Sequence, residues 1–265
     1  MIDALLFNAI LLIAVVILLW LVSVRIGDVS FIDAFWGAGM AMLAIASFAQ
    51  VDAPGPLAWL LLAMTTAWGF RLGIHLFRRW RREGEDQRYE RILRRDREKG
   101  RFALAALVKI WLGQAVLLFL VSSPAQVGIL AAGDAMAIPP LAWAGLALYG
   151  VGIFFEWVGD WQLARFKADP ENEGEILDTG LWRYTRHPNY FGDACTWWGI
   201  WLVTAAIGWE WALYTVAGPI FLTFTLTRWS GAALLEKGMR KKRGDKYAEY
   251  VARTSSFIPW PPARG

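Results

Sequence analysis

Residues 178–193 carry the densest group of side chains that could do chemistry, and they lie between two long apolar segments. The stretch reads Asp-Thr-Gly-Leu-Trp-Arg-Tyr-Thr-Arg-His-Pro-Asn-Tyr-Phe-Gly-Asp. Pro188 has a fixed φ and no N–H to lose, so it can occupy the first position of a helix. Arg183, Arg186 and His187 would then lie where free N–H groups and arginines favour an anion, above all a phosphate. The alternative is a basic loop beside a membrane that faces anionic lipid.

Two further polar segments belong with this stretch. Residues 160–167 read Asp-Trp-Gln-Leu-Ala-Arg-Phe-Lys, and a basic segment with two tyrosines covers residues 236–250. Alone, such a tail is typical of the cytoplasmic side of a membrane protein. Together, the three segments could enclose a large phosphate-bearing cofactor, while the apolar segments before residue 122 supply a pocket open to lipid. The sequence has no Rossmann glycine motif and no P-loop, so a nucleotide would bind without either.

A second group of candidates consists of ionisable residues inside apolar segments, where a charge is costly and indicates function by default. Arg71, His75, Glu156 and Asp160 could equally be anchors at the membrane interface. A short carboxylate cannot reach far toward water, so Asp33 and Asp193 each need a cation, a donor or a proton. Counting the apolar segments from the N-terminus, the ionisable groups are placed as follows: Asp33 in the second segment (30–50), Arg71 and His75 in the third (57–77), Lys109 in the fourth (104–122), Glu156 and Asp160 at the end of the fifth (138–159), and Asp193 at the start of the sixth (190–207).

The composition indicates a polytopic, all-α membrane protein. Hydrophobic residues make up 57% of the 265 residues, and 17 tryptophans and 15 phenylalanines are among them. Together they contribute more apolar surface than a soluble domain of this length can bury. A single cysteine and two histidines exclude a disulfide framework and a cysteine- or histidine-rich metal site. We therefore expect no metal, no nucleic acid partner, and membrane lipid around the chain.

Apolar segments and basic residues together predict seven transmembrane helices. All 27 lysines and arginines fall at or beside alternate ends of these segments, which puts the N-terminus outside and the C-terminus in the cytoplasm. We expect one membrane domain over residues 1–265: helices 1–122 around a substrate pocket, with a cytoplasmic, weakly amphipathic loop at 78–103, and a cofactor-binding half at 138–265. The segments are 4–24, 30–50, 57–77, 104–122, 138–159, 190–207 and 210–228.

The run Gly180-Leu-Trp-Arg-Tyr-Thr-Arg-His-Pro-Asn-Tyr-Phe-Gly-Asp193, followed by Trp197 and Trp198, resembles the steroid 5α-reductase family. More broadly it is similar to membrane sterol reductases and isoprenylcysteine methyltransferases. The likeness is strong over about residues 156–260 and weak over 1–150. In the reductase branch this half binds NADPH, and basic groups would suit its phosphates. The resemblance carries cofactor binding onto Asp160, Gln162, Arg165, Lys167, Arg183, Tyr184, Arg186, His187, Asn189, Tyr190, Asp193, Glu236, Arg240 and Tyr247.

The family's reaction, reduction of the C4–C5 double bond of a 3-oxo-Δ4 steroid, is what this resemblance implies. Hydride goes to the β-carbon of the enone, so a donor must lie beside the carbonyl oxygen. The eukaryotic reductases use a Gln-Glu pair in the second span and a tyrosine in the third, and this chain has neither. Asp33 is the expected counterpart of the glutamate, neutral and donating in an apolar pocket, and Tyr89 is the second donor. Trp36, Trp68, Arg71 and His75 are the candidate substrate-binding residues.

Two other functions stay open at this stage. An S-adenosylmethionine-dependent methyltransferase of isoprenyl or lipid substrates shares the Arg-His-Pro-x-Tyr loop and the basic tail. A lipid-binding or scaffold protein without enzymatic activity would leave the polar cluster at 183–193 unexplained. The absence of a eukaryotic targeting signal favours a bacterial inner membrane.

Overall fold

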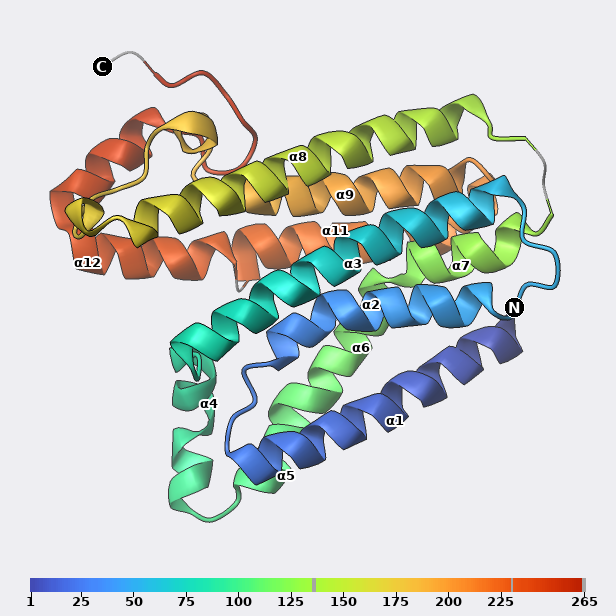
Figure 1. The fold of residues 1–265 in the computed structure, drawn as a ribbon, viewed down its shortest axis with the longest axis horizontal. Coiled ribbons are helices and arrows are strands. Elements are labelled where there is room, and N and C mark those ends of the chain that lie inside the picture. Colours follow the sequence, from blue (N-terminus) through green and yellow to red (C-terminus); the bar gives the residue numbers. More distant parts are fainter. Residues whose placement is uncertain (135–136, 230, 264–265) are drawn as a thin grey trace. The chain divides into compact units, whose positions relative to one another are not determined.

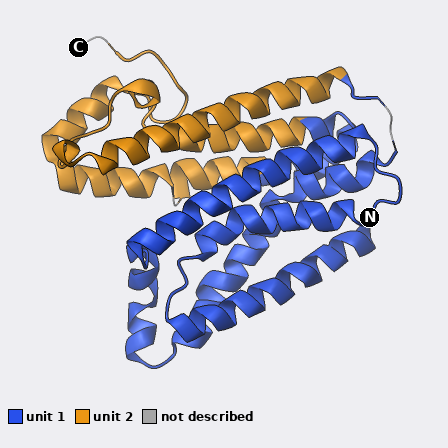
Figure 2. Cartoon of the chain, viewed as in Figure 1, with its two compact units in different colours: residues 1–139, 203–218 blue, residues 140–202, 219–265 orange. Residues whose placement is uncertain are grey.

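The structure is a computed structural model that describes residues 1–134, 137–229 and 231–263. Within these ranges every named element is a helix (Figure 1). The chain divides into two compact units, residues 1–139 with 203–218, and residues 140–202 with 219–265 (Figure 2). The all-helical prediction is confirmed for the described residues.

Unit 1 contains the helices of the N-terminal half. Its elements are α1 (Ile2–Ile26), α2 (Ile32–Phe48), α3 (Pro56–Glu83), α4 (Gln87–Glu98), α5 (Phe102–Ala106), the π-helical turn η1 (Leu107–Trp111), α6 (Leu112–Val121), α7 (Ser123–Ala132) and α10 (Trp209–Thr215). Unit 2 contains α8 (Pro140–Ala168), the short 3₁₀ turns η2 (Pro170–Asn172) and η3 (Gly180–Arg183), most of α9 (Pro188–Ala205), most of α11 (Ala217–Phe224), the π-helical turn η4 (Thr225–Trp229) and α12 (Ala232–Arg253).

Four described helical segments are long and apolar enough to cross a membrane: residues 2–26, 56–83, 102–121 and 140–168. The apolar helix α2 is shorter. These four segments coincide with four of the predicted spans, and their length and composition are those of a membrane protein. The predicted span 210–228 is instead divided among α10, α11 and η4.

The helix α7 lies outside the seven predicted spans. Most of its residues are buried. Gly128 explains how it packs, since a Cβ there would lie 2.7 Å from Leu61 of α3 and closer still to the hydroxyl of Thr204. A second contact supports this position, because the Thr204 hydroxyl donates to the carbonyl of Pro124 at 2.7 Å. Small residues therefore let α7 pack deep within unit 1.

Helices α2 and α3 approach each other at glycines. A Cβ on Gly37 would lie 2.4 Å from the carbonyl oxygen of Gly69, and a Cβ on Gly69 would lie equally close to that of Gly37. No side chain fits between the two backbones at this point. Small residues of this kind are how helices in lipid reach close van der Waals contact.

A buried polar cluster joins α1, α2 and α7 inside unit 1. The Asn8 amide donates to the hydroxyl of Ser47 at 2.7 Å and to Oε1 of Gln126 at 2.9 Å. Gln126 in turn donates to the hydroxyl of Ser122 at 2.8 Å. All four side chains are fully buried. Because each donor has an acceptor here, the cluster fixes the helices without leaving a polar group unsatisfied in an apolar interior.

In unit 2, helices α8 and α9 also meet through glycines. A Cβ on Gly152 would lie 2.5 Å from the backbone nitrogen of Thr196, and a Cβ on Gly192 would lie 2.5 Å from that of Glu156. This close packing positions the start of α9 and therefore the loop before it. The other end of the unit bends sharply inside α12, at Gly244, whose φ of 51° favours glycine.

Candidate functional site

The loop before α9 is built as a short 3₁₀ turn followed by a helix start. The turn η3 ends at Arg183, and α9 begins with Pro188, as predicted for that proline. Gln162 of α8 holds the turn by accepting a hydrogen bond from the backbone N–H of Leu181 at 3.0 Å. The Trp182 indole donates to the carbonyl of Gly159 at 3.1 Å. Gln162, predicted to bind cofactor, thus positions the loop.

A buried ionic cluster lies at the centre of the loop. Arg186 donates to Oε1 of Glu236 from Nε at 2.9 Å and from Nη2 at 2.8 Å. Nε2 of His187 lies 3.2 Å from the same oxygen. The hydrogen bond with His187 and then the pairing with Arg186 hold the pKa of Glu236 below its usual value, although burial acts in the opposite direction. Glu236 therefore carries the charge that neutralises the buried arginine.

The segment after α12 fastens the loop from the other side. Arg186 donates through Nη1 to the carbonyl of Thr254, and its backbone N–H donates to the carbonyl of Ser255 at 2.9 Å. The Thr185 hydroxyl donates to the carbonyl of Phe257 at 2.8 Å. The backbone N–H of Trp260 donates to the carbonyl of Tyr184 at 2.9 Å. These contacts involve residues 254–260, which follow the predicted tail segment 236–250, whereas Glu236 is the member of that segment that contacts the loop.

Cations around this loop divide into two kinds. Arg186 is 8% exposed and its donors are used within the protein. The predicted cations that remain at the surface of unit 2 are Arg165, Lys167, Arg183 and Arg240. Arg165 lies over the Trp161 ring at 5.7 Å. All five cations were predicted to bind the anion of a cofactor. In the structure Arg186 is buried and bonded to Glu236 and Thr254, whereas the other four cations are exposed.

The remaining predicted cofactor residues lie on the same unit. Asn189 at the start of α9 donates to Oδ1 of Asp160 on α8 at 3.1 Å. The Tyr190 ring stacks on His187 with a centroid distance of 5.4 Å and an interplanar angle of 11°. Tyr184 is 44% exposed. Two other members are enclosed: Oδ1 of Asp193 is buried within α9, and burial raises the pKa of Tyr247 to about 12.

The two predicted catalytic residues of unit 1 lie in contact. The Tyr89 hydroxyl donates to Oδ1 of Asp33 at 2.6 Å, and Arg88 donates to Oδ2 of Asp33 at 2.7 Å. Burial and the neighbouring Asp33 raise the pKa of Tyr89 well above its usual value. Asp33 was expected to lie in an apolar pocket. That expectation is wrong, because Arg88 lies 2.7 Å and Arg79 3.9 Å from its Oδ2.

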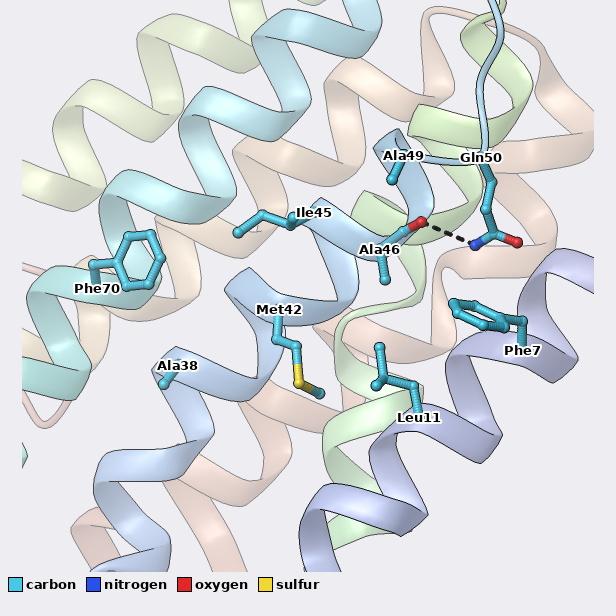
Figure 3. Close-up of a pocket in the computed structure, with 9 residues that line it drawn as sticks. All are labelled: Phe7, Leu11, Ala38, Met42, Ile45, Ala46, Ala49, Gln50 and Phe70. Carbon is cyan, nitrogen blue, oxygen red and sulfur yellow. Dashed lines mark hydrogen bonds between the residues drawn. The ribbon is translucent and has the colours of Figure 1, made fainter.

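The four predicted substrate-binding residues lie on two neighbouring helices, Trp36 on α2 and the other three on α3. Trp36 donates from its indole to Oε1 of Gln114 on α6 at 2.6 Å, and Trp68 is 2% exposed within the core of unit 1. Arg71 and His75 are half-buried on α3. A cavity of about 500 Å³ does lie in unit 1, but it is lined by other residues of α1, α2 and α3 (Figure 3).

Sequence reasoning missed the partners that hold these groups. Arg88 and the carbonyl of Thr254 are examples, since each contacts a candidate that lies 55 or 68 residues away in the chain. The acidic and basic residues interleaved over 83–98 were the available signal for Arg88. Backbone carbonyls carry no sequence signal, because every residue has one.

Comparisons with known proteins give a family without an activity. The model of a family described as "Protein of unknown function (DUF1295)" matches residues 19–254. An uncharacterized protein of Schizosaccharomyces pombe is 25% identical over 223 residues, which are 74% of this chain and 61% of that protein. The chain thus spans about three fifths of that relative's length. No solved structure matches the chain.

Proposed function

We propose that this chain, which belongs to the DUF1295 family, is an NADPH-dependent membrane reductase of 3-oxo-Δ4 steroid-like enones. The observation that carries the proposal is the loop of unit 2 that contains Arg183 and ends at α9. Its backbone is fixed by the Arg186–Glu236 pair and by the tail, while Arg183 itself stays accessible. A fixed loop that carries an accessible cation and leads into a helix supports binding of a phosphate-bearing cofactor.

The residues of unit 2 fit NADPH by their chemistry. Arg165, Lys167, Arg183 and Arg240 supply accessible positive charge for the pyrophosphate and the 2′-phosphate. In addition, the buried Nε–H of Arg243 donates to none of the described residues. Asn189 and Asp160 form a polar pair suited to ribose or amide groups. When bound, NADPH would supply the hydride.

Tyr89 and Asp33 of unit 1 are the proposed source of the donor that the reaction requires. Hydride addition to the β-carbon of an enone places negative charge on its carbonyl oxygen, where a hydrogen-bond donor stabilises it. The raised pKa of Tyr89 keeps its proton on the phenol at neutral pH. A carbonyl oxygen would take the hydrogen bond that Tyr89 now gives to Asp33. Asp33 and Arg88 hold the phenol in place until then.

The membrane arrangement belongs to the same proposal. We place seven spans in the membrane, with the N-terminus outside and the C-terminus in the cytoplasm. The support is the distribution of all 27 basic residues. A bacterial inner membrane is the proposed location.

The test is a reaction with the purified protein in detergent. The protein is incubated with NADPH or S-adenosylmethionine and a 3-oxo-Δ4 steroid, and the product is identified by mass spectrometry. We expect loss of the nicotinamide absorbance and a product heavier by two hydrogens. Arg183→Ala should weaken NADPH binding about ten- to a hundredfold, since one charge-assisted contact is lost. Arg94→Ala, an exposed cation of α4 in unit 1, is the matched control.

Two results would overturn the proposal. One is equal NADPH affinity in wild type, Arg183→Ala and Arg94→Ala, with no oxidation of the cofactor. The other is methyl transfer from S-adenosylmethionine to a lipid or isoprenyl acceptor. That second result would replace the reductase by a methyltransferase.

A further inference from the structure

A pocket between α1, α2 and α3 is lined by residues that have no assigned role in the proposed reduction. Its cavity is about 500 Å³ and it lies wholly within unit 1 (Figure 3). Phe7 and Leu11 of α1 form one wall, Ala38 and Met42 of α2 lie along its length, and Phe70 of α3 closes the far side. This volume lies in the range of sites that hold a small ligand.

The pocket opens toward the surface that lipid covers. Phe7 is 53% exposed, Ile45 is 44% exposed and Phe70 is 49% exposed, and all three belong to apolar helices of a membrane-protein chain. An open apolar surface that faces lipid is in contact with hydrocarbon rather than water. A pocket of this kind in a bilayer is therefore filled by hydrocarbon, and its occupant comes from the membrane.

The length of the pocket matches one leaflet. It extends along α2 from Ala38 to Gln50, which is about 18 Å at a rise of 1.5 Å per residue. The hydrocarbon core of a bilayer is about 30 Å thick, so the pocket spans roughly half of it. Because α2 ends at Phe48, the Gln50 end of the pocket lies nearer the membrane surface in the proposed seven-span arrangement, and the Ala38 end lies nearer the bilayer centre.

The surface end carries one oriented polar group. Both N–H bonds of the Gln50 amide are used, one by the carbonyl of Ala46 at 2.9 Å and one by Oδ1 of Asn8 at 3.1 Å. Asn8 is fixed by the buried polar cluster described above. Gln50 is exposed, and its Oε1 receives no hydrogen bond from the described residues, so this oxygen is available as an acceptor at that end of the pocket.

We propose that this pocket binds a lipid alcohol from one leaflet, with its apolar body along α2 and its hydroxyl donating to Oε1 of Gln50. An ester or ether group has oxygen acceptors but no hydrogen-bond donor, so it could not donate to Oε1 of Gln50. Binding would also bridge α1, α2 and α3 and so stabilise unit 1 by mass action. This inference depends on unit 1 alone and stands or falls independently of the proposed reduction.

The test uses a photoreactive hexadecanol that carries a diazirine on its chain. The protein is reconstituted in phosphatidylcholine nanodiscs, irradiated, digested and analysed by mass spectrometry. We expect label on peptides that contain Phe7, Leu11 or Met42. Unlabelled hexadecanol should compete about three- to tenfold better than its methyl ether, because the ether lacks the donor. Met42→Trp should lower labelling about tenfold by filling the pocket.

Two controls separate the pocket from general lipid contact. Leu18→Trp adds the same ring at a 62% exposed position of α1 outside the pocket and should leave labelling unchanged. Gln50→Leu should remove the preference for alcohol over ether. Equal competition by alcohol and ether in wild type would overturn the proposal, and this comparison needs no variant to fold. Label confined to peptides outside the pocket, or lost equally in Leu18→Trp, would overturn it as well.

Discussion

Removing the carboxylate of Glu236 tests whether the buried cluster holds the loop before α9. Arg186 has a side chain only 9% exposed, and Glu236→Ala would leave its guanidinium without a counter-charge. Removing one partner of a buried ion pair costs about 3–5 kcal/mol. We expect the lower end of that range, because Glu236 is 16% exposed and Arg186 keeps the carbonyls of Thr254 and Val251 as acceptors.

Glu236→Gln separates charge from shape. The amide keeps an oxygen for Arg186 but replaces charged by neutral hydrogen bonds, which are weaker by about 1 kcal/mol each. The measurement is reversible unfolding in detergent micelles, followed by tryptophan fluorescence. Glu249→Ala, an exposed position on the same helix, is the control and should unfold like wild type. If Glu236→Ala and Glu249→Ala unfold at the same midpoint, the cluster does not stabilise the unit and the reasoning fails.

The same pair sets a dependence on pH. The pKa of Glu236 is lowered from 4.5 in the folded state, first by the hydrogen bond with His187 and also by Arg186. A lowered pKa contributes stability that is complete above about pH 4.5 and is lost as pH falls through the folded-state pKa. The wild-type midpoint should therefore drop more steeply below pH 4.5 than that of Glu236→Gln. Parallel slopes for the two proteins would contradict this.

Three further outcomes follow from the geometry. Tyr89→Phe should keep NADPH binding while turnover falls about 10²–10⁴-fold, measured as single-turnover NADPH oxidation. Normal turnover in this variant would show that Tyr89 is not the donor in the chemical step and that Asp33 does not act by positioning it. Gly37→Ala should abolish the folded protein or lower its melting temperature sharply, because its Cβ would clash with a carbonyl oxygen, whereas Gly113→Ala meets nothing within 4 Å and should be neutral or slightly stabilising. A reporter fused at Asp134 should read as external, and a cytoplasmic signal there would refute the seven-span topology.

The sequence predicted the long apolar helices well, because hydropathy over about 20 residues is a strong signal. Predicted spans at 4–24 and 57–77 became α1 (Ile2–Ile26) and α3 (Pro56–Glu83). The polar last turns of α3 fell outside the hydropathy window. The helix α7 escaped because its burial depends on small residues that match a partner elsewhere in the chain, and hydropathy does not measure that match.

The candidate site was predicted as a set of residues but not as an arrangement. Arg186 and Glu236 were both assigned to the cofactor, yet they neutralise each other across 50 residues of sequence. Asp33 and Tyr89 were both predicted to be donors, and they do lie in contact. In that contact Tyr89 donates and Asp33 accepts, and Asp33 accepts from Arg88 as well. Residue types reveal which groups can titrate or bind, whereas their roles depend on partners that only the fold supplies.

The contacts between the loop and the tail also determine when the loop can become ordered. The Thr185 hydroxyl can donate to the carbonyl of Phe257 only after that residue, 72 positions later in the chain, has been synthesised. At a synthesis rate of about 5–20 residues per second, that partner emerges roughly 4–14 seconds after the loop. During this interval the loop lacks the contacts from residues 254–260 that fix its backbone. A chain that ends before residue 254 would therefore lack an ordered loop, so only molecules synthesised through the tail acquire the proposed binding loop.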